Sequence, residues 1–310
     1  MKKIILIIAS VIMFGSIISI IIYLQYPKSS SLQTNFEEQQ DKSPEAEKLQ
    51  PIYDDDHTVG YSLQNKELNI TFDKGKTWQY VPIEIDKLFA GEYNGNKQEL
   101  IKNSYILSEN RVAFLYMEKT NEYENKVVLT YSHDQGKTWK DAIVTDRYPM
   151  IRFRKVAFLT EEFGYVIISG DRVVAQEASN VYITFDGGEN WKETNQSGVT
   201  RLISDGGFID EQTGFLSYGT INPDEPELYV TQDGGNIWTQ AFINVPENYH
   251  EIFVTAEIPF KEEAHLVLLV NQGPNGDYKG GKVKGKFISK DNGKTWEFSK
   301  EIEVDDQEAG

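Results

Sequence analysis

The hydrophobic positions form one long run near the N-terminus and many short runs after residue 50. Lys2 and Lys3 precede the long run, which extends for 21 residues without a charge, from Ile4 to Leu24. A helix rises about 1.5 Å per residue, so this run can cross the roughly 30 Å hydrocarbon core of a bilayer. The pattern predicts a transmembrane anchor within residues 1–26.

The charges around this run indicate its orientation. Two lysines before it and none within it favour an N-terminus in the cytoplasm, so the rest of the chain would be extracytoplasmic. A cleaved signal peptide is the alternative. The uncleaved anchor is favoured because the run is longer than the usual apolar segment of a signal peptide and no A-x-A-like site follows. We therefore expect a single-pass protein of the cell membrane.

Residues 27–50 contain almost no apolar side chains and many Ser, Gln, Glu and Asp residues. Such a segment buries too little surface to offset the entropy lost on ordering, which predicts a flexible polar linker. The predicted folded domain spans residues 51–310.

Short β-rich runs in this domain are punctuated by one eight-residue pattern, Ser/Thr-x-Asp-x-Gly-x-Thr/Asn-Trp. It occurs five times, at residues 71–78, 132–139, 184–191, 231–238 and 289–296, and the fourth copy has Ile237 in place of Thr or Asn. All five tryptophans of the chain lie in these copies. The defining residues are Asp73, Gly75, Trp78, Asp134, Gly136, Trp139, Asp186, Gly188, Trp191, Asp233, Gly235, Trp238, Asp291, Gly293 and Trp296.

The residue types in this pattern are those of a tight hairpin turn. An Asp side chain accepts hydrogen bonds from the backbone N–H groups that follow it, and Gly supplies a positive φ. Trp then starts the next strand and packs its large apolar surface inward. Each copy is thus predicted to join two strands and to have a structural role.

A second repeat lies upstream of each copy, where an apolar residue is followed six residues later by a small one. Phe158 precedes Gly164, and Phe208 precedes Gly214. Together the two hairpins predict four antiparallel strands per repeat. The repeat aspartates are 61, 52, 47 and 58 residues apart, which matches one propeller blade per copy. The longest spacing is expected to hold an insertion near Glu84 to Asn96.

These features predict an all-β fold, a β-propeller of four-stranded antiparallel blades. Five blades are expected from five copies, and six blades, one of them unmarked, are the alternative. The octamers resemble the Asp-box, or BNR, repeats of sialidases, sortilin-like receptor ectodomains and the photosystem II assembly factor family. The resemblance covers about residues 51–304. It implies that the aspartates lie at the blade periphery with a structural role, and it implies no particular function.

The charge and composition of the chain exclude some classes of partner and site. The formal net charge is −17, and it becomes −19 without Lys2 and Lys3. A domain this acidic repels phosphate backbones, so nucleic acid is not expected as a partner. The chain has no cysteine, which excludes disulfides and thiolate metal sites. The absence of cysteine, the short anchor and the many Lys, Ile and Asn residues are typical of a bacterial surface protein.

The sharpest enzymatic hypothesis is a sialidase, which needs three arginines converging on the substrate carboxylate. The chain has six arginines, none of them in the first repeat, and no Arg-Ile-Pro element. Arg152 and Arg154 alternate on one predicted strand, so they are expected to share a face and to be able to contact an anion. A solvated face is the alternative interpretation.

Other candidate chemistry is weak. The Asp-x-Gly elements lack the further acidic positions of a calcium loop. The cluster of Asp54 to His57 is interpreted as a solvated loop. Residues 276–282 resemble a phosphate-binding loop but continue with Val283 where Ser or Thr is needed, so a hairpin is expected. We expect no cofactor, no metal and no catalytic residue.

These observations favour a non-catalytic, membrane-anchored binding or assembly module for a protein or glycan ligand. A glycoside hydrolase of sialidase-like architecture is the alternative.

Overall fold

The computed structural model describes most of the domain that follows the predicted linker. The described residues are 48–53, 59–120, 125–173, 176–219, 221, 223–273 and 275–303. By internal contacts the chain divides into two units, residues 1–48 and 49–310. The predicted anchor and nearly all of the linker lie outside the described residues. In the part that is described, no helix is long and apolar enough to span a bilayer.

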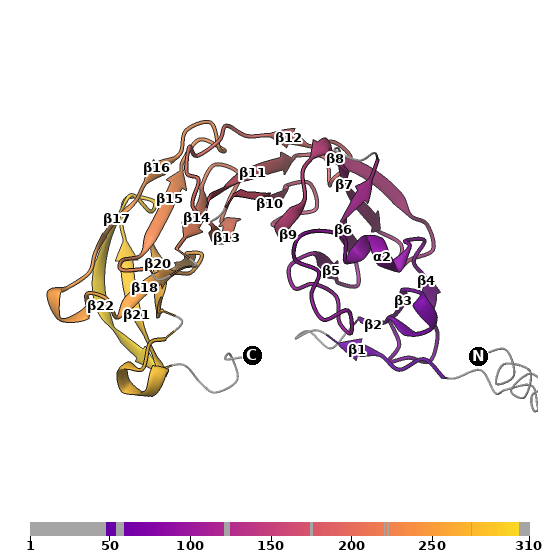
Figure 1. Cartoon of the computed structure of the whole chain (residues 1–310), viewed down its shortest axis with the longest axis horizontal. Helices are drawn as coiled ribbons and strands as arrows, with labels where there is room; N and C mark the ends of the chain where they lie inside the picture. The colour runs from indigo at the N-terminus through magenta and orange to yellow at the C-terminus, as the bar shows by residue number, and fades with distance from the viewer. Residues whose placement is uncertain are drawn as a thin grey trace, which may run out of the picture. The chain divides into compact units, whose positions relative to one another are not determined.

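The described part of the second unit forms five β-sheets that follow the order of the chain, as the colours of Figure 1 show. The first sheet has the order β1-β2-β3-β4, with β1 (Ile52–Tyr53), β2 (Gly60–Ser62), β3 (Asn69–Thr71) and β4 (Gln79–Tyr80). The second contains β5 (Tyr105–Leu107), β6 (Val112–Lys119), β7 (Asn125–Ser132) and β8 (Lys140–Tyr148). The third contains β9 (Ile151–Phe158), β10 (Gly164–Val173), β11 (Gln176–Thr184) and β12 (Lys192–Glu193).

The last two sheets continue the series. The fourth contains β13 (Ile203–Phe208), β14 (Gly214–Tyr218), β15 (Glu227–Thr231) and β16 (Thr239–Gln240). The fifth has the order β17-β22-β21-β20-β18, with β19 also pairing with β20: β17 (Phe242–Asn244), β18 (Phe253–Ala256), β19 (Phe260–Glu262), β20 (His265–Gln272), β21 (Val283–Ser289) and β22 (Thr295–Glu303). Short helical turns are η1 (Gln64–Lys66), α2 (Ile85–Leu88), η2 (Glu247–Tyr249) and η3 (Tyr278–Gly281).

The prediction of an all-β fold with four-stranded antiparallel sheets is confirmed, with one departure in the last sheet. Strand β17 pairs in parallel with β22, from Phe242 opposite Thr295 to Asn244 opposite Glu297. It follows the two-residue strand β16 almost at once, so the chain leaves the fourth sheet and extends along the edge of the fifth. The predicted insertion contains α2, and residues 276–282 lie between β20 and β21.

The upstream repeat forms the first hairpin of its sheet for a steric reason. Phe158 pairs with Gly164 across β9 and β10, and Phe208 pairs with Gly214 across β13 and β14. A Cβ on Gly164 would lie 2.5 Å from the Phe158 ring, and one on Gly214 would lie 2.7 Å from the Phe208 ring. Each phenylalanine therefore covers a position where only glycine fits.

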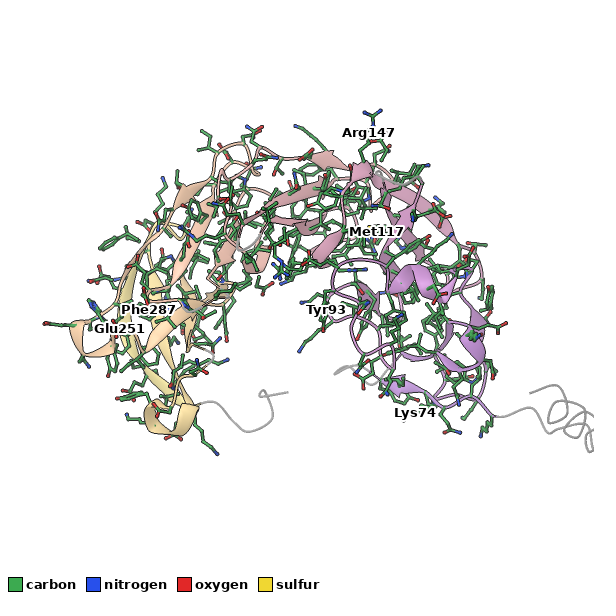
Figure 2. The ribbon with its side chains drawn as sticks, in the orientation of Figure 1. Lys74, Tyr93, Met117, Arg147, Glu251 and Phe287 are labelled. Atoms are coloured by element: carbon green, nitrogen blue, oxygen red, sulfur yellow. The ribbon has the colours of Figure 1, made fainter. Side chains whose placement is uncertain are left out.

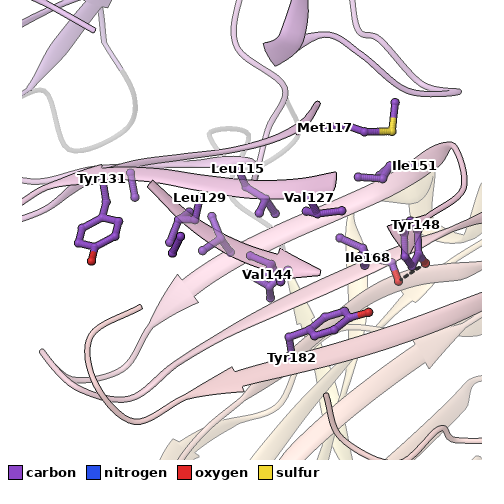
Figure 3. Close-up of a cluster of buried hydrophobic side chains, with 14 residues drawn as sticks. Leu115, Met117, Val127, Leu129, Tyr131, Val144, Tyr148, Ile151, Ile168 and Tyr182 are labelled. Atoms are coloured by element: carbon purple, nitrogen blue, oxygen red, sulfur yellow. Dashed lines mark hydrogen bonds between the residues drawn. The ribbon is translucent and has the colours of Figure 1, made fainter. Parts of the chain in front are cut away.

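Alternation along the central strands places apolar side chains on both faces of a sheet. On β6, Leu115 and Met117 pack in one buried cluster, whereas Phe114 and Tyr116 pack in another. Four such clusters join the five sheets pairwise in chain order. Figure 3 shows the cluster between the second and third sheets, where Tyr148 Oη also donates to the carbonyl of Ile168 (3.3 Å). Each inner sheet is buried on both faces because period-two side chains reach both neighbours.

The repeat tryptophans connect each sheet to the one before it. Trp139, Trp191, Trp238 and Trp296 belong to the clusters that join their own sheets to the preceding ones. Trp296 is fully buried and Trp238 nearly so. Trp78 is partly exposed, and no sheet precedes its own in the described chain. Inward packing thus depends on a neighbouring sheet as well as on the turn.

Candidate functional site

The five Asp-box turns share one set of hydrogen bonds. In the first, Thr71 Oγ1 donates to Asp73 Oδ1 (2.9 Å) and accepts from the Gly75 N–H (2.8 Å). Asp73 Oδ1 also accepts from the Thr77 N–H (2.8 Å), and Oδ2 accepts from the Thr77 hydroxyl (2.6 Å). Equivalent bonds occur in the other four turns, apart from the Oδ2 bond of the fourth. The turn itself therefore uses the carboxylate.

These bonds favour the charged carboxylate. Hydrogen bonds from Thr77 lower the pKa of Asp73 to about 2, and those from Thr138 lower the pKa of Asp134 to about 2. A group that must be reprotonated during a reaction near neutral pH needs a pKa much closer to that pH. The geometry therefore fits a turn-forming carboxylate and not a general acid.

The irregular fourth turn provides a test. Ile237 replaces the residue whose side chain would bond Asp233 Oδ2, and it is 63% exposed. Ile237→Thr is expected to stabilise the fold by about 0.5–1 kcal/mol by restoring that bond. Because the added bond lowers the pKa of Asp233 further in the folded state, the gain is present above the unfolded pKa and is lost as pH falls through the folded one. Thermal unfolding of both proteins at pH 7 and at about pH 2, the pKa of the fully bonded Asp73, measures it, and the absence of a gain at pH 7 contradicts it.

The prediction that Arg152 and Arg154 share a face is wrong. Strand β9 pairs Phe153 with Ser169 but Ile151 with Gly170, so Arg152 is the extra residue of a β-bulge. A bulge redirects the side chain at that position. Arg152 consequently points toward the fourth sheet, where its Nη2 donates to the Ile203 carbonyl (2.8 Å).

Arg152 forms a buried ion pair on that side of the third sheet. Its Nε donates to Glu177 Oε2 (2.7 Å), and its Nη2 bonds Glu177 Oε1. The Glu177 side chain is fully buried, and its Oε1 also accepts from Ser169 Oγ (2.9 Å) and the Ile203 N–H (3.2 Å). The two charges are therefore neutralised within the protein.

Arg154 points instead toward the insertion that carries α2. It is 2% exposed, and its guanidinium donates to the carbonyl oxygens of Leu88 (3.3 Å), Ala90 (2.7 Å) and Tyr93 (3.1 Å). Burial lowers its pKa to about 10. Gly91 permits this approach, because a Cβ there would lie 2.5 Å from Arg154 Nη2. Both guanidinium groups thus bind protein oxygens, and their role as anion contacts stays a prediction.

The remaining arginines also contact protein groups. Arg111 donates to the carbonyl of Glu161 and its guanidinium carbon lies 3.5 Å from the centroid of the Phe158 ring. Arg172 pairs with Glu92 (2.8 Å) and Arg201 with Glu227. Arg147 points away from the sheets in Figure 2. The guanidinium groups of Arg152, Arg154 and Arg172 are therefore already bound to protein groups, and those of Arg154 and Arg172 bind the same segment, from Leu88 to Tyr93.

The other candidate groups are dispersed. The Asp54 to His57 cluster lies outside the described residues. Among the residues that are described, no group of three or more His, Asp or Glu side chains could hold a metal ion. In the loop with glycines at 276, 280 and 281, Lys279 bonds Glu301, and a strand follows where a phosphate-binding loop would lead into a helix. This loop is a connection within the fifth sheet, as predicted.

A hollow lined by described residues lies between the fourth and fifth sheets. A cavity of about 880 Å³ adjoins one of about 390 Å³, and the two share Pro223, Asp224 and Glu251. We call their joint surface the acidic groove. One wall is the loop between β14 and β15, and the other is formed by residues 240–253 and the loop after β20. Its size is in the range of sites that hold small ligands or a few amino-acid residues.

Sequence reasoning missed the acidic groove. Its carboxylates come from segments about 25 residues apart, and only folding brings them together. The available signal is the run from Pro223 to Pro226, in which two prolines flank two acidic residues. Such a run indicates an exposed, stiff loop, which is where binding residues concentrate.

A family model for the BNR/Asp-box repeat matches residues 130–141, 182–193 and 287–298. The chain carries BNR/Asp-box repeats. The first and fourth turns lie outside these matches, but they share the hydrogen bonds from the Asp carboxylate and the Thr hydroxyl described above. No curated protein sequence matches the chain.

Three solved structures illustrate the structural similarity. A sialidase of Trypanosoma rangeli in complex with sialic acid is 13% identical, with a TM-score of 0.42, over 80% of this chain and 46% of that one. A Hadza microbial sialidase is 15% identical, with a TM-score of 0.43, over 80% and 56%. A protein of unknown function from Dyadobacter fermentans is 14% identical, with a TM-score of 0.39, over 65% and 70%. The aligned part spans about half of each sialidase, and at these TM-scores the likeness carries no functional argument.

Proposed function

We propose that this protein is a membrane-anchored, extracytoplasmic β-propeller of five blades that binds a protein or glycan partner and catalyses no reaction. The observation that carries the proposal is the occupation of the arginines by protein groups. Arg152, Arg154 and Arg172 already bind protein carboxylates or carbonyls, so these three offer no open clamp for a substrate carboxylate. A sialidase depends on such a clamp, because bidentate Arg–carboxylate pairs fix the substrate.

The anchor and the orientation follow from the sequence. The run from Ile4 to Leu24 is long enough to span a bilayer, and Lys2 and Lys3 favour the cytoplasm for the N-terminus. A polar linker then separates the membrane from the repeats. In this arrangement the propeller presents its loops to partners outside the cytoplasm.

Enzymatic assay of the full chain in detergent tests the non-catalytic role. With fluorogenic sialosides and xylosides, we expect turnover no higher than that of a boiled sample, whereas a known sialidase in the same detergent is active. Turnover clearly above that of the boiled sample would establish a hydrolase instead. The binding role is checked in parallel with the chain immobilised on beads. A membrane protein or glycan that it retains must bind again in purified form.

A further inference from the structure

We propose that the acidic groove binds an extended peptide segment of a partner protein in which Lys or Arg side chains alternate with apolar ones. This proposal rests on the binding role above and names the partner class. It is based on the cavity between the fourth and fifth sheets, on its exposed apolar side chains and on its uncompensated negative charge.

The apolar component comes from both walls. Ile221, on the loop between β14 and β15, is 57% exposed, and Phe242, on β17, is 65% exposed. Both line the larger cavity. Large apolar side chains that are this exposed and line one hollow mark a surface whose burial by a partner is favourable.

Three carboxylates make the groove negatively charged. Asp224, Glu225 and Glu251 line it, are exposed and form no ion pair within the described part of the chain. Arg201 is a cation in the same wall, and its partner Glu227 already neutralises it. Figure 2 shows Glu251 on the loop outside the strands of the fifth sheet. The groove therefore complements a cationic partner, and the net charge of −17 steers such a partner toward the protein.

These features together distinguish a peptide from the other occupants. A neutral oligosaccharide would leave the carboxylates without counter-charge, and an anionic one would be repelled by them. A free polyamine would satisfy the carboxylates but would leave Ile221 and Phe242 uncovered. A peptide with both cationic and apolar side chains can pair with the carboxylates and also cover Ile221 and Phe242.

The test uses the full chain in non-ionic detergent and fluorescein-labelled peptides. The probe is a decapeptide in which Lys alternates with Leu and Ala, and its matched control has Glu in place of Lys. Fluorescence anisotropy at low and at physiological salt gives the affinities. Chitotetraose and spermine are added as competitors.

Three variants localise the binding. D224N/E225Q/E251Q neutralises the acidic groove, and Phe242→Ser removes an apolar wall. E109Q/E162Q/E263Q is the matched control, because it removes the same charge from exposed glutamates on turns outside the groove. Thermal unfolding of each variant verifies that it folds.

We expect the Lys peptide to bind and the Glu peptide to fail. The groove triple variant should lose about tenfold or more in affinity, and the control triple about twofold or less. Phe242→Ser should weaken binding while leaving its salt dependence unchanged, because it removes no charge.

Several results would overturn the proposal. Equal losses in the two triple variants would mean that the overall charge, not the groove, attracts the peptide. Displacement of the peptide by spermine alone, with Phe242→Ser unaffected, would identify a polyamine site. Binding of chitotetraose in place of the peptide would identify a glycan site. A protein partner that binds the groove variant normally would remove this proposal and leave the binding role intact.

Discussion

Replacing Gly293 with alanine is expected to lower the free energy of unfolding by about 2–5 kcal/mol. Gly293 has φ +88°, and its Cβ would lie 2.5 Å from the ring of Phe215 in the preceding sheet. Phe215 is fully buried, so its ring has no open space into which to move. The substitution therefore adds backbone strain and a steric overlap.

The same substitution at Gly75 separates these two causes. Gly75 holds the corresponding place in the first turn with φ +78°, but its Cβ would lie 3.4 Å from its nearest neighbour, in Pro51. Gly75→Ala is expected to cost about 1–2 kcal/mol from the backbone alone. Denaturant unfolding followed by tryptophan fluorescence compares the stability losses of Gly293→Ala and Gly75→Ala. Equal losses would show that packing between sheets contributes nothing at Gly293, whereas Phe215→Leu should partly rescue Gly293→Ala.

Removing Arg152 is expected to destabilise the third sheet by about 3–5 kcal/mol, because Arg152→Met leaves the Glu177 carboxylate buried without its cation. The cost arises mainly from the remaining charge, so removing the charge as well should recover most of the stability. Arg152→Met/Glu177→Gln keeps an amide oxygen that can accept from Ser169 Oγ and from the Ile203 N–H.

Thermal unfolding midpoints of the single and double variants measure this effect. For a domain of this size about 1 kcal/mol shifts the midpoint by roughly 2–4 °C. Lys140→Met is the control, because Lys140 and its partner Glu189 are 64% and 55% exposed and solvent screens their pair. A double variant as unstable as Arg152→Met would contradict the buried-charge explanation, and so would a control that loses as much.

Local features of the chain were predictable because their causes are local. The bonds from Asp73 and Thr71 span at most four residues, and the Phe158–Gly164 pairing spans six. Residue type and spacing therefore carry the information for these turns. The packing of Trp296 was predictable in direction, since a large apolar side chain that follows a turn favours burial.

The arginines illustrate what local reasoning could not supply. Alternation places Arg152 and Arg154 on one face, and this holds only for a regular strand. The bulge depends on the pairing of Ser169 with Phe153 and of Gly170 with Ile151, which belongs to the neighbouring strand β10. The parallel pairing of β17 with β22 likewise depends on a partner about 50 residues away.

The sequence by itself determined the repeated turn, the four-stranded unit and the strand order within each unit, because hydrogen bonds and steric fits between nearby residues specify them. Only the tertiary structure decided which groups meet between units. It separated Arg152 from Arg154, and it brought Asp224, Glu251 and Phe242 to one groove. Such contacts join segments that are distant in the chain, and their geometry depends on the packing of one whole sheet on the next.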